Sequence, residues 1–568
     1  MEKRSKRLVL LLFIVFFLVV IPLMAFFGLF SRGARTGIKA KAVVLDVQGS
    51  MLDYEPQFSA GILLARNGNT QTYVLTVIDR AARDRRVGAL VVRVLPSSAG
   101  AAKCDEIRSA LNRFRKTGKR VIVFSPMLVN HHYLIACAAD SVFMPPSGYL
   151  LLSGPASSAM FIRGTFDKLG IAPNIHRIGE YKSAAEMFTE RERTPPSRRM
   201  VEQLLRDLHD RFVESVAAGR GVGEDTVRAW IDRTLFSPRN ALREGLIDGV
   251  RYWDQIVSSL GGGRTELVNS REYMRSAGAI SLAAPRIAVV HAQGRIVMGE
   301  SGIDPVNGLT MGSETITREL RRARTSSRID AVILRVDSPG GDALAGEMIA
   351  RAVEITAREK PVVVSMSDVA ASGGYEISYR ADCIVALPGS VTGSIGSIIG
   401  KLNMRGLYNR IGVTKDEIGI GGKALMNSDY RDFSDEEWDV IKEEHWAFYR
   451  DWIADIARRR DMTVEEVDSL GRGRVWTGSQ AIERGLIDEL GGLDRALEEA
   501  CDLAGIEDPS RVVLVHYPER MSLVQILLSG RLFDGTVEYA LHAALQRVLA
   551  GSGPVMFRRE LPESMDMR

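Results

Sequence analysis

The sequence predicts an α/β fold made of two tandem copies of one unit, each with a mainly parallel β-sheet, preceded by one N-terminal membrane-spanning helix. Three observations predict it: a long apolar run near the N-terminus, sequence blocks that recur at a nearly constant offset, and short apolar runs that alternate with amphipathic stretches in each copy. With 568 residues, the chain has ample length for two such units.

Residues 8–30 form the apolar run, after a charged N-terminus at residues 1–7. These 23 uncharged residues would span about 34 Å as a helix, enough for a bilayer core of about 30 Å. A cleaved secretory signal is the alternative, but its apolar core usually has about 7–15 residues. We therefore expect an uncleaved anchor. Basic residues flank the run on both sides, so charge alone does not set its orientation.

The internal duplication rests on four pairs of similar blocks. The pairs are 41–49 with 286–294, 89–95 with 331–337, 139–140 with 381–382, and 241–248 with 481–488. The offset is 245 in the first block, 242 in the next two and 240 in the last. We expect a first copy at 41–257, a linker at 258–285, a second copy at 286–505 and a tail at 506–568. The amphipathic part of that tail, residues 522–549, is interpreted as a packing or oligomer-contact helix.

Within the second copy, apolar runs predict strands at 287–290, 331–335, 362–365 and 383–387. Amphipathic patterns predict helices at 314–324 and 343–359, and a helix start at 375–379. Strand–helix alternation of this kind is typical of βαβ units with right-handed crossovers.

Composition excludes several functional classes. Hydrophobic residues make up 46% and charged residues 25%, and a net charge of +4 without a long basic stripe gives no nucleic-acid signature. No two of the four cysteines lie within four residues of each other, so neither a disulfide framework nor a metal site is expected. The four are Cys104, Cys137, Cys383 and Cys501.

Two glycine turns follow predicted neighbouring strands of the second copy. Ser338–Gly341 (SPGG) opens a helix, and its backbone N–H groups could stabilise an oxyanion. Ser372 stands at the next turn between two alanines and two glycines. Sites of open α/β sheets lie at these strand ends. Each turn alone could equally be a tight packing corner, but the two together favour acyl transfer.

A nucleophilic serine needs a base. None of the eight histidines stands in a recognisable triad context, the penicillin-binding pattern S-x-x-K is absent, and no phosphate-binding P-loop occurs. A lysine remains as the type of base. Its pKa of about 10.4 must fall to about 7–8, a shift that burial can supply. Periodicity alone does not identify which lysine this is.

Beyond these residue patterns, the chain resembles a known family, the long tandem-repeat form of bacterial signal peptide peptidase, also called protease IV. The segments that carry the resemblance are Asp368–Tyr375 (DVAASGGY), Gly179–Ala184 (GEYKSA), Thr392–Gly396 (TGSIG) and Arg335–Gly341 (RVDSPGG). It implies Ser372 as nucleophile, Lys182 as general base and Ser394 as the hydroxyl that hydrogen-bonds the lysine.

The same resemblance implies an oxyanion hole made by the N–H of Gly340 or Gly341 together with that of Gly373. Asp337 departs from the asparagine-type residue that the family has before Ser-Pro. The implied fold is crotonase-like, as in the Clp protease subunit. The implied protein is a homotetramer without cofactor, anchored in the bacterial cytoplasmic membrane with its catalytic part on the outer, periplasmic face. Its substrates would be released signal peptides and other extended apolar peptides. A catalytically inactive membrane scaffold and an acyl-CoA-type enzyme of the same fold are the alternatives.

The duplication gives this resemblance a chemical meaning. At an offset of 242, Asn130 corresponds to Ser372 and Ala424 to Lys182, so each copy would keep one half of a Ser–Lys dyad. Lys423, one position from Ala424, is an alternative base within the second copy. Whether one chain or two neighbouring chains supply the two groups, 190 residues apart, stays open at this point.

Overall fold

The computed structural model describes residues 42–55, 69–260, 267–276, 283–304 and 308–519. The segment 1–7, the predicted anchor 8–30 and the amphipathic segment 522–549 lie outside these ranges. Within the ranges, no helix combines the length and the apolar character needed to cross a membrane.

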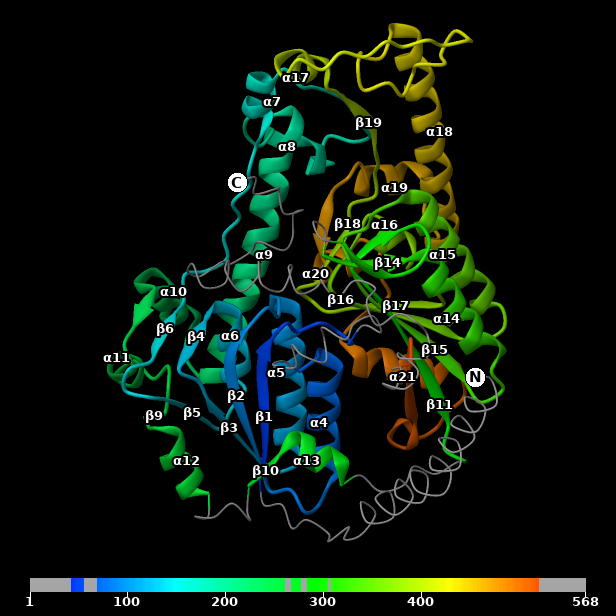
Figure 1. Cartoon of the computed structure of the whole chain (residues 1–568). Coiled ribbons are helices and arrows are strands. Elements are labelled where there is room, and N and C mark those ends of the chain that lie inside the picture. Colours follow the sequence, from blue (N-terminus) through cyan, green and yellow to red (C-terminus); the bar gives the residue numbers. More distant parts are fainter. Residues whose placement is uncertain (1–41, 56–68, 261–266, 277–282, 305–307, 520–568) are drawn as a thin grey trace, which may run out of the picture.

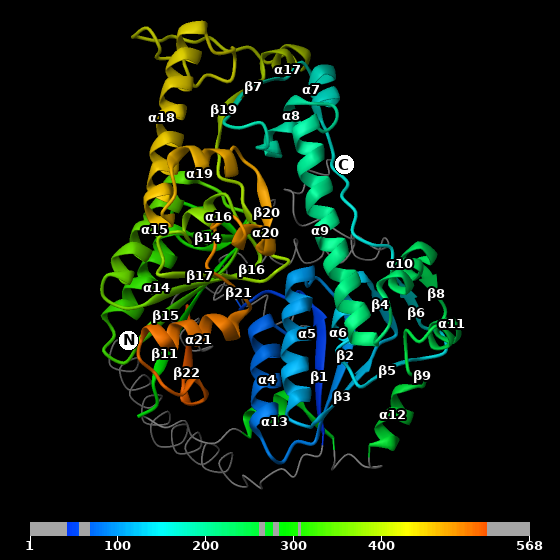
Figure 2. The same ribbon diagram turned by 180° about the vertical axis from the view of Figure 1, so that it is seen from behind.

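Two large sheets have the same strand order, as Figures 1 and 2 show. The first runs β10 (Leu267–Asn269), β1 (Ala42–Gly49), β2 (Ala89–Ser97), β3 (Arg120–Phe124), β5 (Ser141–Met144) and β9 (Gly249–Val250). The second runs β22 (Val513–Tyr517), β11 (Arg286–Gln293), β15 (Ala331–Ser338), β16 (Val362–Ala371), β17 (Cys383–Ala386) and β21 (Glu489–Leu490). Every pair in both runs is parallel. The prediction of an α/β fold with mainly parallel sheets is confirmed.

One edge of each sheet extends the copies beyond their predicted ends. β10 lies in the predicted linker 258–285 and pairs with β1, and β22 lies in the predicted tail 506–568 and pairs with β11. Each copy thus closes with a strand beside its own first strand. Sequence reasoning missed these strands because such pairing is a contact between distant parts of the chain, and a short segment carries no signal for it.

A smaller layer of strands continues from the large sheets. In the first copy it contains β4 (Met127–Val129), β6 (Tyr149–Leu151) and β8 (Leu235–Phe236). In the second copy the end of β16 takes the place of β4 and pairs with β18 (Val391–Gly393), which pairs with β20 (Val475–Thr477). β16 therefore passes through both layers, and Ser372 follows its last residue.

A third contact joins the two copies at one end of the molecule. β7 (Ala172–Arg177) pairs antiparallel with β19 (Ile398–Asn403) of the second copy. In Figures 1 and 2 this ladder lies beyond the large sheets, beside α7 (Arg163–Leu169) and α17 (Arg405–Arg410). Two 26-residue helices, α9 (Pro195–Arg220) and α18 (Asp435–Arg460), run toward it from the two copies. The chain just after β7 is thereby carried to the second copy.

Buried aliphatic side chains on both sheet faces form the core. In β1, Val43, Leu45 and Val47 pack against α4 (Gln71–Arg83) and α5 (Ala101–Lys116), while Ala42 and Val44 face α12 (Trp253–Ser259). Runs that are apolar on both faces are typical of covered parallel sheets. The second sheet repeats this pattern with α14 (Ser313–Thr325) and α15 (Ala343–Ala357) on one face and α21 (Leu493–Leu503) on the other.

The remaining elements are short connections around these layers. They are α6 (Asn130–Ala136), α8 (Glu186–Thr189), α10 (Glu224–Arg233), α11 (Pro238–Arg243), α13 (Ser270–Arg275), α16 (Gly373–Glu376), α19 (Val464–Leu470), α20 (Gly478–Ile482), β12 (Arg295–Val297), β13 (Gly302–Asp304) and β14 (Gly308–Gly312).

Candidate active site

Ser372 occupies a strained turn between β16 and α16. Its φ of 56° and ψ of −119° lie where non-glycine residues are rare. The surrounding contacts hold this conformation, since the Ser372 N–H donates to the Gly393 carbonyl at 2.8 Å. A serine in such a turn, immediately after a buried parallel strand, projects its hydroxyl from the end of the sheet.

Close packing explains the small residues on either side of Ser372. A Cβ on Gly374 would lie 2.5 Å from the Ser338 carbonyl oxygen, and one on Gly373 would lie 2.9 Å from the Ile296 side chain. The two glycine turns predicted from the sequence therefore pack directly against each other, and any larger side chain would push them apart.

Lys182 reaches Ser372 from the first copy. Its Nζ lies 2.9 Å from Ser372 Oγ, 2.9 Å from the Ser394 carbonyl oxygen and 3.0 Å from Ser394 Oγ. The ammonium form would donate to all three oxygens, whereas the neutral amine has a lone pair that can accept the Ser372 proton. The structure thus brings Ser372, Lys182 and Ser394 together within a single chain.

Backbone contacts after β7 hold the segment that carries Lys182. The Ile178 N–H donates to the Ser397 carbonyl at 3.0 Å, and the Tyr181 N–H donates to the Arg472 carbonyl at 3.1 Å. Gly473 makes room for this approach, because a Cβ at this position would lie 2.4 Å from the backbone nitrogen of Lys182. The β7–β19 ladder and the loop around Gly473 therefore fix the lysine against the second copy.

Burial sets the charge state of the amine. Only 6% of Lys182 is exposed, and this burial lowers its pKa to about 7, although the carboxylate of Glu376 opposes the shift. Glu376 is itself buried, which raises its pKa to about 8. A substantial part of Lys182 is consequently neutral near neutral pH. Sequence reasoning missed Glu376, because only the folded chain brings its charge near the lysine.

The turn Ser338–Gly341 contains two candidate donors for an oxyanion hole, and their surroundings differ. The Gly340 N–H donates to Ser338 Oγ at 3.2 Å. A parallel bridge to Ile296 uses the Gly340 carbonyl and the Asp342 N–H, so the Gly341 N–H points away from that strand. A Cβ on Gly373 would come within 3.4 Å of the Gly341 nitrogen, so these two residues lie side by side. Gly340 is equally close to Gly373, but its N–H is engaged by Ser338 Oγ, so the direction of the Gly341 N–H favours Gly341 as the partner of Gly373.

Two other positions considered from the sequence, Lys423 and Asn130, lie outside the group formed by Ser372, Lys182 and Ser394. The Lys423 side chain is 43% exposed and lies 4.0 Å from a Glu436 carboxylate oxygen, so the alternative in which it serves as base is wrong. Asn130, at the position equivalent to Ser372, donates to the Gly154 carbonyl at 2.8 Å and accepts from the Ser153 N–H at 2.8 Å. The first copy thus has a structural amide where the second has a hydroxyl.

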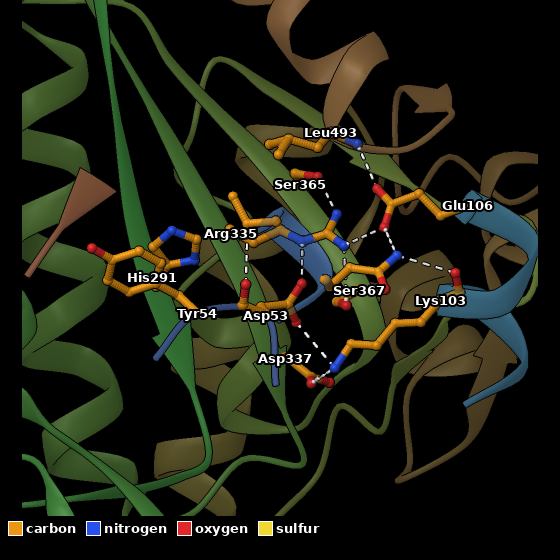
Figure 3. Close-up of polar contacts among 12 residues, drawn as sticks. Asp53, Tyr54, Lys103, Glu106, His291, Arg335, Asp337, Ser365, Ser367 and Leu493 are labelled. Carbon is orange, nitrogen blue, oxygen red and sulfur yellow. Dashed lines mark hydrogen bonds and ion pairs between the residues drawn. The ribbon is translucent and has the colours of Figure 1, made fainter. Parts of the chain in front are cut away.

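A buried ion cluster joins the two copies, as Figure 3 shows. Arg335 of β15 is 1% exposed, and its guanidinium donates to Asp53 at 2.9 Å, to Glu106 at 2.7 Å and to Ser365 at 2.8 Å. Glu106 also accepts the Leu493 N–H at 2.8 Å. Asp53 and Glu106 belong to the first copy, so this arginine ties the second sheet to it.

Lys103 extends the cluster to Asp337. Its buried Nζ lies 2.6 Å from an Asp337 carboxylate oxygen, 3.2 Å from Asp53 and 3.9 Å from Asp368. Burial alone would lower the pKa of Lys103, but the three carboxylates outweigh burial and raise it. Asp337, the residue before Ser338, is therefore paired with a lysine from the first copy.

A buried amine beside a strained serine hydroxyl is the arrangement of serine hydrolases that use an amine as base instead of an imidazole. Comparison with known proteins narrows the class. The sequence model of peptidase family S49 matches residues 113–264 and 354–507, one stretch in each copy, and the chain belongs to this family of serine peptidases.

Named relatives cover most of the chain. It is 31% identical over 504 residues to "Serine protease SPPA, chloroplastic" of Arabidopsis thaliana, covering 87% of this chain and 73% of that protein. It is 30% identical over 481 residues to "Protease 4" of Haemophilus influenzae, covering 80% and 77%. A protein of Enterococcus faecium named as a signal peptide peptidase, SppA, is 35% identical over 181 residues, covering 32% and 53%.

Proposed function

We propose that the chain is a Ser–Lys dyad endopeptidase, in which Ser372 is the nucleophile, Lys182 the general base and Ser394 the residue that orients the amine. The observation that carries the proposal is the 2.9 Å separation between Lys182 Nζ and Ser372 Oγ, at an amine whose pKa burial lowers to about 7. No metal or cofactor takes part in this chemistry.

In the first half-reaction, neutral Lys182 takes the Ser372 proton as Ser372 Oγ bonds to the peptide carbonyl carbon. The carbonyl oxygen gains the negative charge and accepts hydrogen bonds from the Gly341 and Gly373 N–H groups. When the C–N bond breaks, the Lys182 ammonium returns a proton to the leaving amine. Water, deprotonated by Lys182, then attacks the acyl carbon, and the Ser372 oxygen leaves with the proton.

Exposed apolar side chains near the dyad support extended apolar peptides as substrates. Leu344 and Met348 are exposed on α15, which begins just after the oxyanion turn, and Met298 is exposed two residues after Ile296. Ile398 and Ile399 are exposed at the start of β19, close to the Lys182 segment. Released signal peptides have an apolar middle that such a surface would bind.

The location of the protein in the cell and its assembly belong to the same proposal. Residues 8–30 would anchor the protein in the bacterial cytoplasmic membrane, with the crotonase-like copies on the outer face and four chains in the assembly. The apolar run supports the anchor, and the family resemblance supports the fold name, the side of the membrane and the tetramer. A serine-directed fluorophosphonate probe tests the chemistry: covalent label on Ser372 is expected, and its absence would favour the inactive scaffold or the acyl-CoA-type enzyme.

Peptide cleavage is expected to rise with pH through about 7. Because the reactive form is the neutral amine, kcat/KM should fall about tenfold per pH unit below the pKa of Lys182 and level off above it. Steady-state cleavage of a fluorogenic peptide across this range measures the effect. A profile that stays flat from mildly acidic to alkaline pH is incompatible with a lysine base.

Glu376→Gln is expected to move this acidic limb to lower pH. The Glu376 carboxylate raises the pKa of Lys182, so its removal should leave a larger neutral fraction at a given acidic pH. The shift should be less than about one pH unit, because Glu376 is itself largely protonated below its raised pKa of about 8. An unchanged or alkaline-shifted limb in a variant with wild-type melting behaviour would refute this role.

A further inference from the structure

The first copy contains an unexplained cluster at the place where the second copy has its active site. Cys104 of α5 and His131 and His132 of α6 each offer one ligand atom, and these three atoms lie within 4.8 Å of one another. The cluster lies directly beside Asn130, the counterpart of Ser372. Nothing in the proposed peptidase chemistry uses it.

The duplication makes the composition of this cluster informative. At the offset of 242, Cys104 corresponds to Gly346, His131 to Gly373 and His132 to Gly374. In the second copy these three glycines let the turns pack closely around Ser372 and Glu376. In the first copy a thiol and two imidazoles take those places. Metal-ligating groups at all three positions need a reason beyond packing.

The burial and hydrogen bonding of His132 are those expected of a metal ligand. His132 is 3% exposed, and its Nε2 lies 2.8 Å from Ser97 Oγ, while its buried Nδ1 has no hydrogen-bond partner among the residues that the structure describes. Leaving a buried polar atom unpaired is energetically unfavourable. A metal-binding histidine usually has its other ring nitrogen hydrogen-bonded, and here the Ser97 hydroxyl is that partner.

A metal ion binds neutral imidazole nitrogens and a thiolate, so binding would release one proton from the buried Cys104 thiol.

We propose that Cys104, His131 and His132 form a binding site for a divalent transition metal ion, with Zn²⁺ the preferred ion. One thiolate and two imidazoles select Zn²⁺ over Mg²⁺ or Ca²⁺, which prefer oxygen ligands. With bonds of about 2.3 Å to sulfur and about 2.0–2.1 Å to nitrogen, ligand atoms around zinc lie about 3.3–3.6 Å apart. Separations of up to 4.8 Å would thus have to close by no more than about 1.5 Å. Water would take the fourth position, and the ion would join α5 to α6.

The cysteine spacing in the sequence predicts no metal site here. Cys104 has no second cysteine nearby, and its partners lie on another helix 27 and 28 residues later in the chain. Only the fold brings the three groups together.

The test uses full-length protein that has been stripped with a chelator and then titrated with Zn²⁺ or Co²⁺. We expect one ion per chain by elemental analysis, a higher melting temperature with Zn²⁺, and a near-ultraviolet thiolate-to-metal absorption with Co²⁺. Cys104→Ser should remove the absorption and weaken Zn²⁺ binding by at least about tenfold. Cys137→Ser is the matched control, a buried cysteine of the same copy that lies outside the cluster, and it should keep both properties.

His131→Asn supplies a second variant in case Cys104→Ser does not fold, because His131 is partly exposed and its replacement leaves the buried thiol in place. It should weaken Zn²⁺ binding while retaining the Co²⁺–thiolate absorption at saturating metal. Wild-type protein that takes up no stoichiometric metal would overturn the proposal. So would unchanged binding in both variants, which would assign the metal to another part of the chain.

Discussion

Lys182→Met is expected to reduce kcat for peptide cleavage by about 10⁴-fold, and Ser372→Ala by a similar factor. Methionine keeps the volume of the lysine stem but offers no group that can accept the Ser372 proton 2.9 Å away. Cleavage of a fluorogenic peptide near the pH optimum measures both losses. The double variant should be no slower than the worse single variant, because the two groups act as one unit.

Folding provides the control for this prediction. Replacing a buried charge-bearing side chain by an apolar one of similar size is often neutral or stabilising, so Lys182→Met should melt no lower than the wild type. Lys423→Met, at the exposed lysine excluded by the structure, should retain full activity. A mixture of Lys182→Met and Ser372→Ala proteins should stay inactive, because both groups come from one chain. Full activity of purified Lys182→Met would contradict the dyad.

The second large effect is expected on stability. Lys103→Met should lower the free energy of unfolding by about 3–5 kcal/mol, because it leaves the buried Asp53 carboxylate and the half-buried Asp337 and Asp368 carboxylates without the cation that they share. Denaturant unfolding of the full chain measures the loss. Lys116→Met, on the exposed side of the same helix α5, should leave the free energy of unfolding unchanged.

A double variant separates lost charge pairing from lost packing. Adding Asp337→Asn to Lys103→Met removes one of the uncompensated charges. It should recover part of the lost stability, so the two changes are non-additive. Additive losses in this pair would mean that Lys103 acts through packing alone, and the ion pair with Asp337 would then have no structural importance.

The sequence predicted the architecture well where the signal was local or repeated. Buried strands such as Ala331–Ser338 and Cys383–Ala386 have apolar runs that mark them, and the duplicated blocks predicted two copies of one sheet. β10 and β22 were missed because their partners are distant in sequence. The β7–β19 ladder was missed for the same reason. Asn174 and Lys401 pair across the two copies, and no periodic pattern in the sequence predicts this pairing.

The residues of the candidate site also divide into those with a local sequence pattern and those that only the fold brings together. Ser372 stood out because glycines and alanines around one hydroxyl after a strand are a local pattern. Lys182 was named only through the family resemblance, since a lysine beside Glu180 resembles any solvated charge until the fold buries it. Glu376, the Lys103–Asp337 pair and the Cys104 cluster had no signal at all, because each depends on side chains that the tertiary structure brings together.

The rate of fluorophosphonate labelling at Ser372, followed across pH in the wild type and in Lys182→Met, tests the central claim most directly. We predict one label per chain, mapped to Ser372, with a wild-type rate that rises through about pH 7 and then levels off, and slow labelling without that rise in Lys182→Met. Equal rates and equal pH profiles in the two proteins, or a label on another serine, would contradict the account.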